Sequence, residues 1–408
     1  MKTPFLTALK IRDFRLLWVG LLISAIGSSM QIMGVTWHLY NLTHSAFSLA
    51  LIGLVRFVPL VLFSLIGGII ADIFDRRKIV LMSNLLMTLT ALLLAWATYA
   101  HVVSPFIIYF VLIINSIASS LDTPARQSFV PQIVPKQHWT NALGLIVVLW
   151  QVSLVLGPSI GGFVIAYMGI DFVYFLNFVS FIPLLLALLS IQSVKRTEPT
   201  NVSFNLSSIK EGLRFVRNSP MIYSTMLLDF FATFFSSATV LLPIFAQDIL
   251  LVGPKGLGLL YAAPSVGAII AGMIFSSFGH IKQQGKILLG SVLLYGLTTV
   301  LFGFSKSFYL SLIFLGLTGV GDVVSTIIRN TIRYLSTPDY IRGRMSSINM
   351  IFFVGGPQLG ELEAGLLAGL LGSPVSVVIG GVGTIIATAF IAFAVPKLRK
   401  YQGHELIV

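Results

Sequence analysis

Long apolar runs recur along this 408-residue chain and set what it can fold into. Most runs reach about 20 residues, the length that an α-helix needs to cross ~30 Å of hydrocarbon. Charged residues make up only 10% of the chain, whereas a soluble protein carries about 25%. Because so few charges could not cover the surface of a water-soluble fold, the sequence predicts a polytopic membrane protein.

Polar residues, glycine and proline divide the apolar runs into twelve predicted membrane helices. Several exceed ~20 residues, so they must tilt, kink or project from the bilayer. The predicted spans are 14–40, 46–72, 78–100, 104–134, 139–168, 170–193, 219–247, 255–279, 286–304, 307–335, 344–371 and 374–396. We therefore expect an all-α membrane protein with twelve transmembrane helices.

The basic residues predict how the chain crosses the membrane. Lys and Arg concentrate in the even-numbered junctions and near both termini, whereas the odd-numbered junctions hold only Lys255 and Lys306. Because cytoplasmic loops are enriched in Lys and Arg, both termini and the central loop should be cytoplasmic. The net charge of +12 forms no basic face with interleaved aromatic residues, so nucleic acid is not an expected partner.

One long polar connection, residues 192–220, separates six predicted spans from the next six. It divides the chain into an N-terminal six-helix bundle (1–193), a cytoplasmic linker (194–218) and a C-terminal six-helix bundle (219–408). The linker places apolar residues on one helical face, namely Ile209, Leu213 and Val216. This pattern predicts an amphipathic helix lying on the membrane surface.

The two halves also resemble each other in sequence. ARQSFVPQIVP (125–135) aligns with IRNTIRYLSTP (328–338), which pairs Arg126 with Arg329. GPSIGG (157–162) aligns with GPQLGE (356–361) at nearly the same offset. Two homologous bundles related by an axis along the membrane normal are a transporter arrangement, in which the substrate binds near the midplane.

Five charges interrupt two apolar runs in GGIIADIFDRRK, residues 67–78. This stretch resembles the signature G-x-L-A-D-R-x-G-R-R of the major facilitator superfamily, and the resemblance extends over nearly the whole chain. Ile73 and Asp75 depart from the signature. The residues that match it are Gly68, Ala71, Asp72, Arg76 and Arg77. The resemblance implies the major facilitator fold of two pseudo-symmetric bundles. It also implies a cytoplasmic gate in which Asp72 faces the positive end of the eleventh helix; the alternative is that these charges only solvate a turn.

A second motif, GPSIGG, resembles the signature of antiporters and exporters in this superfamily. Pro158 removes a backbone donor and bends a helix, and the glycines Gly157, Gly161 and Gly162 allow close helix contact. Plain packing is the alternative. Longer stretches, such as LDTPARQSFVPQIVP and GPQLGELEAGLLAGLLG, resemble the branch of drug and siderophore exporters that holds the enterobactin exporter and macrolide efflux proteins.

Ionisable residues inside the predicted spans are candidates for function, because a charge at membrane depth is costly unless it is paired or faces water. Asp122 and Arg126 lie four residues apart on one helical face, which predicts an ion pair with each other or with a neighbouring helix. Arg329 is a third ion-pair candidate. Asp322 shares its face, but at a spacing of seven residues we expect the two to lie too far apart to touch.

Three acids are candidates for proton coupling, namely Asp229, Asp322 and Glu361. Asp229 and Asp322 lie near the middle of their spans without a cation within one helical turn. A carboxylate in a poorly hydrated cavity can gain and release a proton near physiological pH. Capping or bridging of helices is the alternative role. Glu361 and Glu363 are two residues apart, so they cannot both face one cavity.

Five further residues are candidates for lining a substrate cavity, namely Arg56, Gln31, Gln151, Trp37 and Asn41. Arg56 could neutralise an anionic group or have a structural partner in its own helix. Gln31 and Gln151 need hydrogen-bond partners within the membrane. Trp37 could instead mark the membrane interface, where Trp and Tyr are enriched.

The sequence predicts neither a cofactor nor a metal site, because the six histidines are scattered and cysteine is absent. It has no GxxxxGK[ST] motif for ATP, and we do not expect an enzyme. We expect a monomeric secondary transporter of the bacterial inner membrane. It should export an amphipathic small molecule, a drug-like compound or a siderophore, by proton antiport with alternating access. Import or flipping of a lysophospholipid or metabolite on the same scaffold is the alternative; a transport-inactive sensor or scaffold is a remote one.

Overall fold

The structure is a computed structural model that describes residues 6–191, 206–278, 282–338 and 341–403. Within helices it leaves out the side chains at 64–69, 71–73, 206–210, 343 and 347. Two residues of the predicted gate, Gly68 and Asp72, fall in these stretches. Residues 194–205 of the predicted linker lie outside the described residues.

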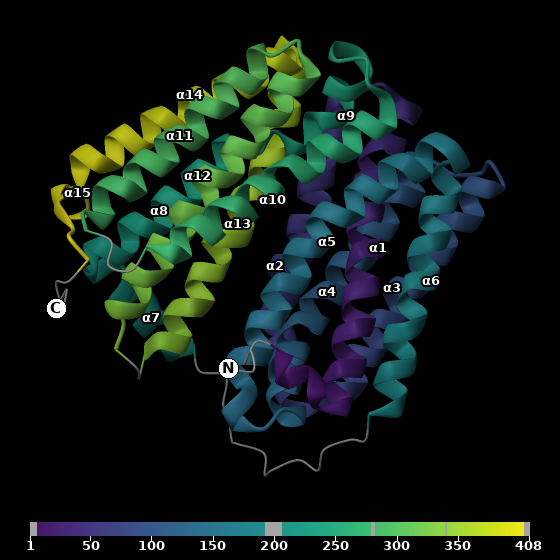
Figure 1. The fold of residues 1–408 in the computed structure, drawn as a ribbon, viewed down its shortest axis with the longest axis horizontal. Helices are drawn as coiled ribbons and strands as arrows, with labels where there is room; N and C mark the ends of the chain where they lie inside the picture. The colour runs from purple at the N-terminus through teal and green to yellow at the C-terminus, as the bar shows by residue number, and fades with distance from the viewer. Residues whose placement is uncertain (1–5, 192–205, 279–281, 339–340, 404–408) are drawn as a thin grey trace. The chain divides into compact units, whose positions relative to one another are not determined.

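The described chain is almost entirely helical (Figure 1). The α-helices are α1 (Arg12–Thr43), α2 (Ala46–Ile73), α3 (Arg76–Tyr99), α4 (Pro105–Ile133), α5 (Trp139–Met168), α6 (Ile170–Ser190), α7 (Leu206–Asn218), α8 (Pro220–Phe235), α9 (Leu242–Ile244), α10 (Gly253–Ser277), α11 (Gln284–Phe304), α12 (Phe308–Leu335), α13 (Arg342–Leu371), α14 (Ser373–Ala394) and α15 (Pro396–Lys400). Shorter turns are η2 (Ala8–Lys10), η3 (Lys136–His138), η4 (Ala238–Leu241) and the π-helical η5 (Phe245–Ile249).

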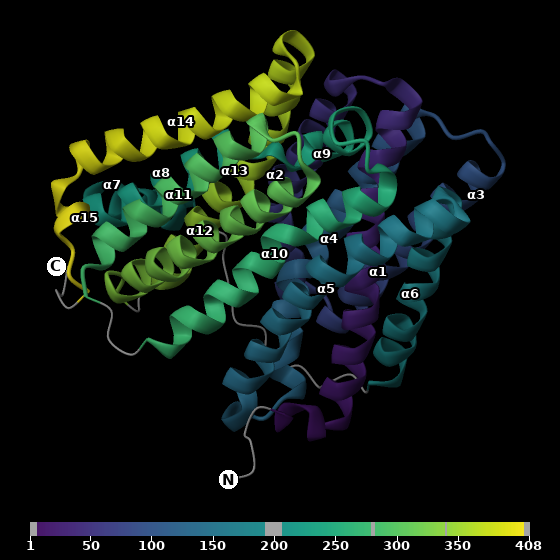
Figure 2. The ribbon, with the colours of Figure 1, turned by 45° about the horizontal axis from the view of Figure 1, so that its top comes forward.

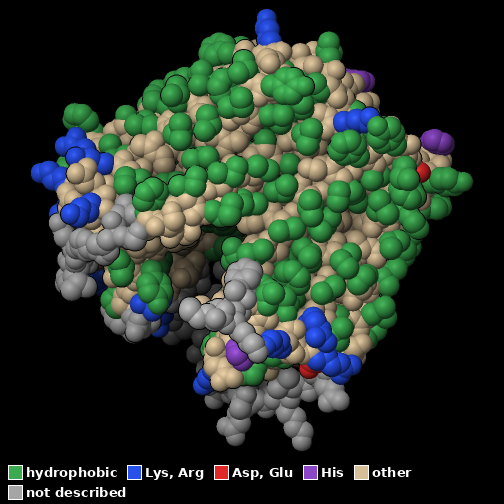
Figure 3. Space-filling view, in the orientation of Figure 1, with side chains coloured by type: hydrophobic (Ala, Val, Ile, Leu, Met, Phe, Trp, Pro, Cys, Tyr) green, Lys and Arg blue, Asp and Glu red, His purple; other side chains and the backbone are tan. Residues whose placement is uncertain are grey.

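All but one of the membrane helices expected from the sequence are confirmed. Within the described residues, 11 helical segments are long and apolar enough to cross a membrane. The eleventh predicted span, α13, is not among them, although it has 30 residues; it carries Glu361 and Glu363 within its length. On the face shown in Figure 3, hydrophobic side chains spread over the helices, and Lys and Arg gather mainly near helix ends.

The chain divides into two compact units. Unit 1 comprises Met1–His44, Val55–Phe204 and Gly253–Ala262, and unit 2 comprises Ser45–Leu54, Asn205–Val252 and Ala263–Val408. The boundary cuts through α2 and α10, so the first residues of each helix pack with the opposite half of the sequence. A division at the central linker alone does not describe this exchange.

The two units repeat one packing order. In unit 1, α1 packs against α5 and α6, and α3 packs against α4 and α6. In unit 2, α8 packs against α13 and α14, and α11 packs against α12 and α14. The helices correspond in chain order. Helices α8, α11, α12, α13 and α14 of unit 2 take the places of α1, α3, α4, α5 and α6 of unit 1, respectively. α11 and α14 run side by side in Figures 1 and 2.

The seventh span differs from the continuous helix that the sequence predicts. α8 ends at Phe235, and the chain continues through η4, α9 and η5. Ser236 turns its hydroxyl to Thr384 of α14 at 2.7 Å, and Ser237 donates to the carbonyl of Thr233 at 2.7 Å. Pro243 adds a residue without a backbone donor. Such side-chain hydrogen bonds and the proline disfavour the regular backbone hydrogen bonds of an α-helix, and the span breaks near its middle.

The amphipathic helix α7 also differs from its prediction. Val216 is only 4% exposed and packs in a core cluster with Ile222, Met226, Met345 and Ile348. Leu213 is exposed. An ion pair joins Glu211 to Arg344. Part of the apolar face of α7 therefore covers protein in unit 2, so the helix does not simply lie on the membrane surface.

Candidate functional site

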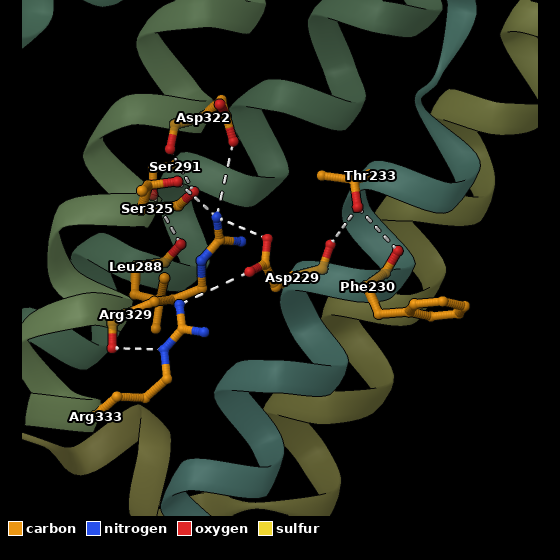
Figure 4. A network of polar contacts seen from close by, with 10 residues as sticks. Asp229, Phe230, Thr233, Leu288, Ser291, Asp322, Ser325, Arg329 and Arg333 are labelled. Atoms are coloured by element: carbon orange, nitrogen blue, oxygen red, sulfur yellow. Dashed lines mark hydrogen bonds and ion pairs between the residues drawn. The ribbon is translucent and has the colours of Figure 1, made fainter. Parts of the chain in front are cut away.

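A network of four charged side chains lies inside unit 2 (Figure 4). Asp229 comes from α8, and Asp322, Arg329 and Arg333 come from α12. Arg329 and Arg333 lie one helical turn apart, so both side chains reach the same carboxylate. Buried apolar residues surround the network on both helices, including Leu228, Ile328 and Ile332.

Arg329 is the centre of the network. Its Nη2 atom lies 3.0 Å from Oδ1 of Asp229 and 3.7 Å from Oδ1 of Asp322. The same nitrogen donates to the Thr326 hydroxyl at 2.7 Å. Arg333 approaches the other oxygen of Asp229 at 3.7 Å and donates from Nε to the carbonyl of Arg329 at 3.2 Å. One carboxylate thus holds two guanidinium groups.

The expectation that Arg329 cannot touch Asp322 is wrong. Seven residues correspond to two helical turns, about 10.5 Å along the axis. A side chain on an α-helix points back toward the N-terminus, so the long arginine extends along α12 in the direction of Asp322. The two groups meet because the arginine side chain is long enough to cover that distance.

The two acids differ sharply in exposure. The side chain of Asp229 is 2% exposed, whereas that of Asp322 is 51% exposed. Arg329 and Arg333 are 1% and 4% exposed. Asp322 lies near the middle of α12, where a charged group is costly unless it faces water or a ligand. Of the four charged side chains, that of Asp322 is therefore the most exposed.

The two acids differ in how many buried cations depend on them. With both acids ionised, the network is neutral. Protonation of Asp229 would leave two buried guanidinium groups without their shared counter-ion, and breaking a buried pair in this way costs about 3–5 kcal/mol. Protonation of Asp322 leaves Arg329 bound to Asp229 and Thr326. The geometry thus ties Asp229 to both buried cations and leaves Asp322 with a longer contact to Arg329 at 3.7 Å.

A second ion pair lies in unit 1, where Arg126 and Asp122 meet at 3.1 Å within α4. Asn84 of α3 donates to the other oxygen of Asp122 at 2.9 Å. The guanidinium of Arg126 lies over the ring of Trp150, 5.2 Å from its centroid. Each oxygen of this carboxylate has one partner, and both charged side chains are largely buried.

The arginines of the predicted gate bind backbone carbonyls inside unit 1. Arg77 donates to Leu188 at 2.5 Å and to Leu189 at 2.9 Å, at the end of α6. Arg76 donates to the carbonyl of Ser128 in α4 at 3.3 Å. The Asp75 side chain accepts from the backbone of Arg77 and caps α3. These bonds fix the start of α3 against α4 and α6.

The glycines of GPSIGG lie at helix contacts. A Cβ atom at Gly157 would lie 2.6 Å from the Cβ of Ser29 on α1. A Cβ at Gly161 would lie 2.7 Å from Cγ of Met30. Gly162 packs against the backbone of Pro254 and Gly258, and Gly258 in turn contacts the carbonyl of Pro158. The spacing therefore allows α5 to pack closely on α1 and on the start of α10, and α5 remains helical through Pro158.

The predicted cavity residues lie on three helices of the structure, with Gln31, Trp37 and Asn41 on α1, Arg56 on α2 and Gln151 on α5. Gln31 is buried and accepts from Asn177 of α6 at 2.6 Å, so its amide oxygen has a partner within unit 1, and the cavity role stays a prediction. Asn41 donates to the carbonyl of Trp37, one turn earlier, at 2.9 Å. The remaining candidates, Arg56 and Gln151, are half-buried in α2 and α5.

The two glutamates of α13 are both half-buried. Glu361 packs beside Gly53 of α2, where an added Cβ would lie 3.0 Å from the Cβ of Glu361. Glu363 has one carboxylate oxygen buried without a hydrogen-bond partner among the described residues.

Two residues of these sites were missed by sequence reasoning. Arg333 binds Asp229, and the signal was its spacing of four residues from Arg329. Asn84 binds Asp122 from another helix, and no local signal marks it. Across the described residues, no group of three or more His, Cys, Asp or Glu side chains could hold a metal ion.

Solved structures show the class of this fold. A bacterial homologue of the human lysosomal transporter Spinster, inward-facing and unoccupied, matches with a TM-score of 0.73 at 14% identity, covering 95% of this chain and 97% of that one. The nucleoside transporter NupG matches at 0.72 with 12% identity, covering 94% and 99%. A bacterial homologue of the iron transporter ferroportin matches at 0.69 with 17% identity, covering 93% and 99%. The fold is that of the major facilitator transporters.

The family follows from the sequence match. The chain belongs to the major facilitator family described as transmembrane secretion effector, whose model matches residues 3–407. The enterobactin exporter EntS of Shigella boydii serotype 18 is 26% identical over 393 residues, covering 95% of this chain and 93% of the relative. EntS of Escherichia coli O81 matches at the same identity and coverage. The chain is thus a multi-pass membrane transporter.

Proposed function

We propose that this protein exports an amphipathic small molecule across the bacterial inner membrane in exchange for protons, by alternating access. The observation that carries the proposal is the split in unit 2 between a buried, doubly paired Asp229 and a half-exposed Asp322. The similarity to enterobactin exporters supports the outward direction. Asp322 is the proposed site of exchange, and Asp229 is the fixed counter-ion that holds the arginines.

Antiport requires that the proton and the substrate use one site in turn. The ionised carboxylate of Asp322 attracts either a proton or a cationic or polar group of a substrate, and occupation by one excludes the other. Arg329 keeps Asp229 and Thr326 as partners in both cases. With Asp322 protonated the network carries one net positive charge, but Arg329 and Arg333 both still face Asp229.

The accessible charge favours some substrates over others. The arginines are buried and the reachable group is a carboxylate, so a cationic or neutral amphipathic compound fits this site better than an anionic one. Exchange of one proton for one monovalent cation moves no net charge. Exchange of one proton for a neutral molecule moves one charge, which a potential of 100 mV favours by about 2.3 kcal/mol.

The test uses purified protein in proteoliposomes with an imposed pH gradient, and ethidium and enterobactin as probes. We expect gradient-driven movement of at least one probe in the wild-type protein and at least a tenfold loss in Asp322→Asn. Asp322→Glu should keep most of the rate. Glu211→Gln, which removes an exposed acid elsewhere in unit 2, is the matched control and should transport as the wild type does.

Two outcomes contradict the proposal. In one, Asp322→Asn transports with the same dependence on the pH gradient as the wild-type protein. In the other, neither probe moves but a fluorescent lysophospholipid crosses the bilayer in the wild-type protein, which would assign lipid flipping instead.

A further inference from the structure

Five basic side chains gather where the end of unit 2 brings α15 against the start of α11. They are Lys282, Lys286, Lys397, Arg399 and Lys400, and we call them the α15 basic corner. We propose that this corner binds the headgroup of an anionic phospholipid. The proposal is independent of the transported substrate.

The fold builds the corner by docking α15 firmly. Leu398 and Tyr401 are 0% and 2% exposed and belong to the core cluster of unit 2. The backbone N–H of Gly285 donates to the carbonyl of Tyr401 at 3.0 Å, and Gly285 also packs against the carbonyl of Leu398. Lys286 and Lys400 directly neighbour the two bonded residues. Two segments more than a hundred residues apart in the sequence therefore present their cations together.

The charges of the corner have no protein counter-ions in the described structure. All five side chains are exposed, and no hydrogen bond or ion pair is found for them among the described residues. The described parts of both segments, 282–287 and 395–403, contain no Asp or Glu. Glu405 follows outside the described residues. The corner is thus a cluster of exposed positive charges to which an external anion can bind.

The corresponding place in unit 1 uses its cations differently. There the start of α3 meets the end of α6, as α11 meets α14 in unit 2. Arg76 and Arg77 donate to the carbonyls of Ser128, Leu188 and Leu189. In unit 2 the backbone hydrogen bond from Gly285 to Tyr401 ties the start of α11 to α15. The cations of the corner therefore do not have to bind backbone carbonyls there.

The position of the corner selects a lipid as the ligand. α11 and α14 are candidate membrane spans. Lys282 and Lys286 lie at the start of α11, and Lys397, Arg399 and Lys400 follow the last residue of α14. The corner therefore lies at the ends of two helices that can cross a membrane, where we expect the lipid headgroups; Figure 1 shows α15 at the end of α14. A cluster of four to eight Lys and Arg next to a membrane helix attracts anionic lipid with about 1 kcal/mol per cation. Arg399 can also bind a phosphate through two parallel hydrogen bonds.

The test measures binding of phosphatidylglycerol and phosphatidylcholine to the purified full-length protein by native mass spectrometry. The variant carries Lys286→Gln, Lys397→Gln, Arg399→Gln and Lys400→Gln. We expect its preference for phosphatidylglycerol to fall roughly tenfold or more, as the loss of several contacts of about 1 kcal/mol each requires. The matched control, Lys10→Gln with Arg12→Gln and Arg15→Gln, removes three cations near the N-terminus and should stay within about twofold of the wild type, since those cations lie outside the corner.

A second variant keeps the test decisive if the fourfold one does not fold. Lys286→Gln with Lys400→Gln leaves α15 docked by Leu398 and Tyr401 and should show a several-fold loss. Equal lipid preference in the wild type and a folded corner variant would overturn the proposal. Binding of soluble glycerophosphate as strongly as the lipid would also overturn it, because the site would then take a free phosphate.

Discussion

Both units place an arginine at the same position of their fourth helix, but they surround it differently. In unit 1, Arg126 pairs with an acid one turn away on its own helix, and Asn84 satisfies the other oxygen. In unit 2, Arg329 takes its main partner, Asp229, from α8 and leaves Asp322 half exposed. The comparison shows how a repeated scaffold can bury both members of one ion pair and leave an acid of the other half exposed.

The largest expected effect tests this difference directly. Asp229→Asn should destabilise the protein by about 3–5 kcal/mol, because two buried guanidinium groups lose their shared counter-ion. Asp122→Asn should destabilise it less, since Arg126 is 14% exposed and keeps its contact with Trp150. Thermal unfolding of the purified variants in one detergent measures both changes.

A double variant sharpens the same comparison. Asp229→Asn combined with Arg333→Gln removes one of the two orphaned cations, so it should be more stable than Asp229→Asn alone. If the double variant is less stable by the full sum of both single changes, Arg333 and Asp229 do not interact and the described network is incorrect.

The start of the third helix in each unit offers the next comparison. Gly285→Ala would place a Cβ against the carbonyl of Leu398 and force α15 to shift, which should cost about 1–3 kcal/mol. Arg77→Ala removes two hydrogen bonds to the end of α6, and because one of them is exposed we expect about 1–2 kcal/mol. Both are read as shifts in the thermal midpoint.

Arg77→Lys is the control for this pair of variants. A lysine has no planar fork that can bind two carbonyls at once, so it should recover little of the loss. Full recovery by lysine would show that charge alone, rather than the two hydrogen bonds, holds α3 to α6.

Local patterns in the sequence were enough to predict the spans and one ion pair. Run length fixes where a membrane helix begins and ends, and a spacing of four residues placed Asp122 beside Arg126. The contact between Asp229 and Arg329 joins helices 100 residues apart in sequence, so no local pattern encodes it. The break after Phe235 depends on a hydroxyl of α14, and the docking of α15 depends on packing with α11; neither is visible until the helices are placed together.

The smallest expected effect compares the polar contact that joins the first and sixth helices of each unit. In unit 1, Gln31 and Asn177 form a buried amide pair between α1 and α6. In unit 2, Ser236 and Thr384 form a hydroxyl pair between the end of α8 and α14 at 2.7 Å. Gln31→Leu should cost about 1–2 kcal/mol, because it leaves a buried amide donor unpaired.

Thr384→Val removes the contact with Ser236 and a long hydrogen bond to the carbonyl of Ala232 at 3.3 Å. We expect a cost of only about 0.5–1.5 kcal/mol, because the hydroxyl of Ser236 can rotate to another acceptor and the bond to Ala232 is long. The double variant Gln31→Leu with Asn177→Leu should recover stability relative to Gln31→Leu alone, since no donor of the pair then remains buried without a partner. Thermal midpoints in one detergent rank all three. If Thr384→Val proves the more damaging single change, the broken seventh span depends on this hydroxyl contact more than the first span depends on its amide pair.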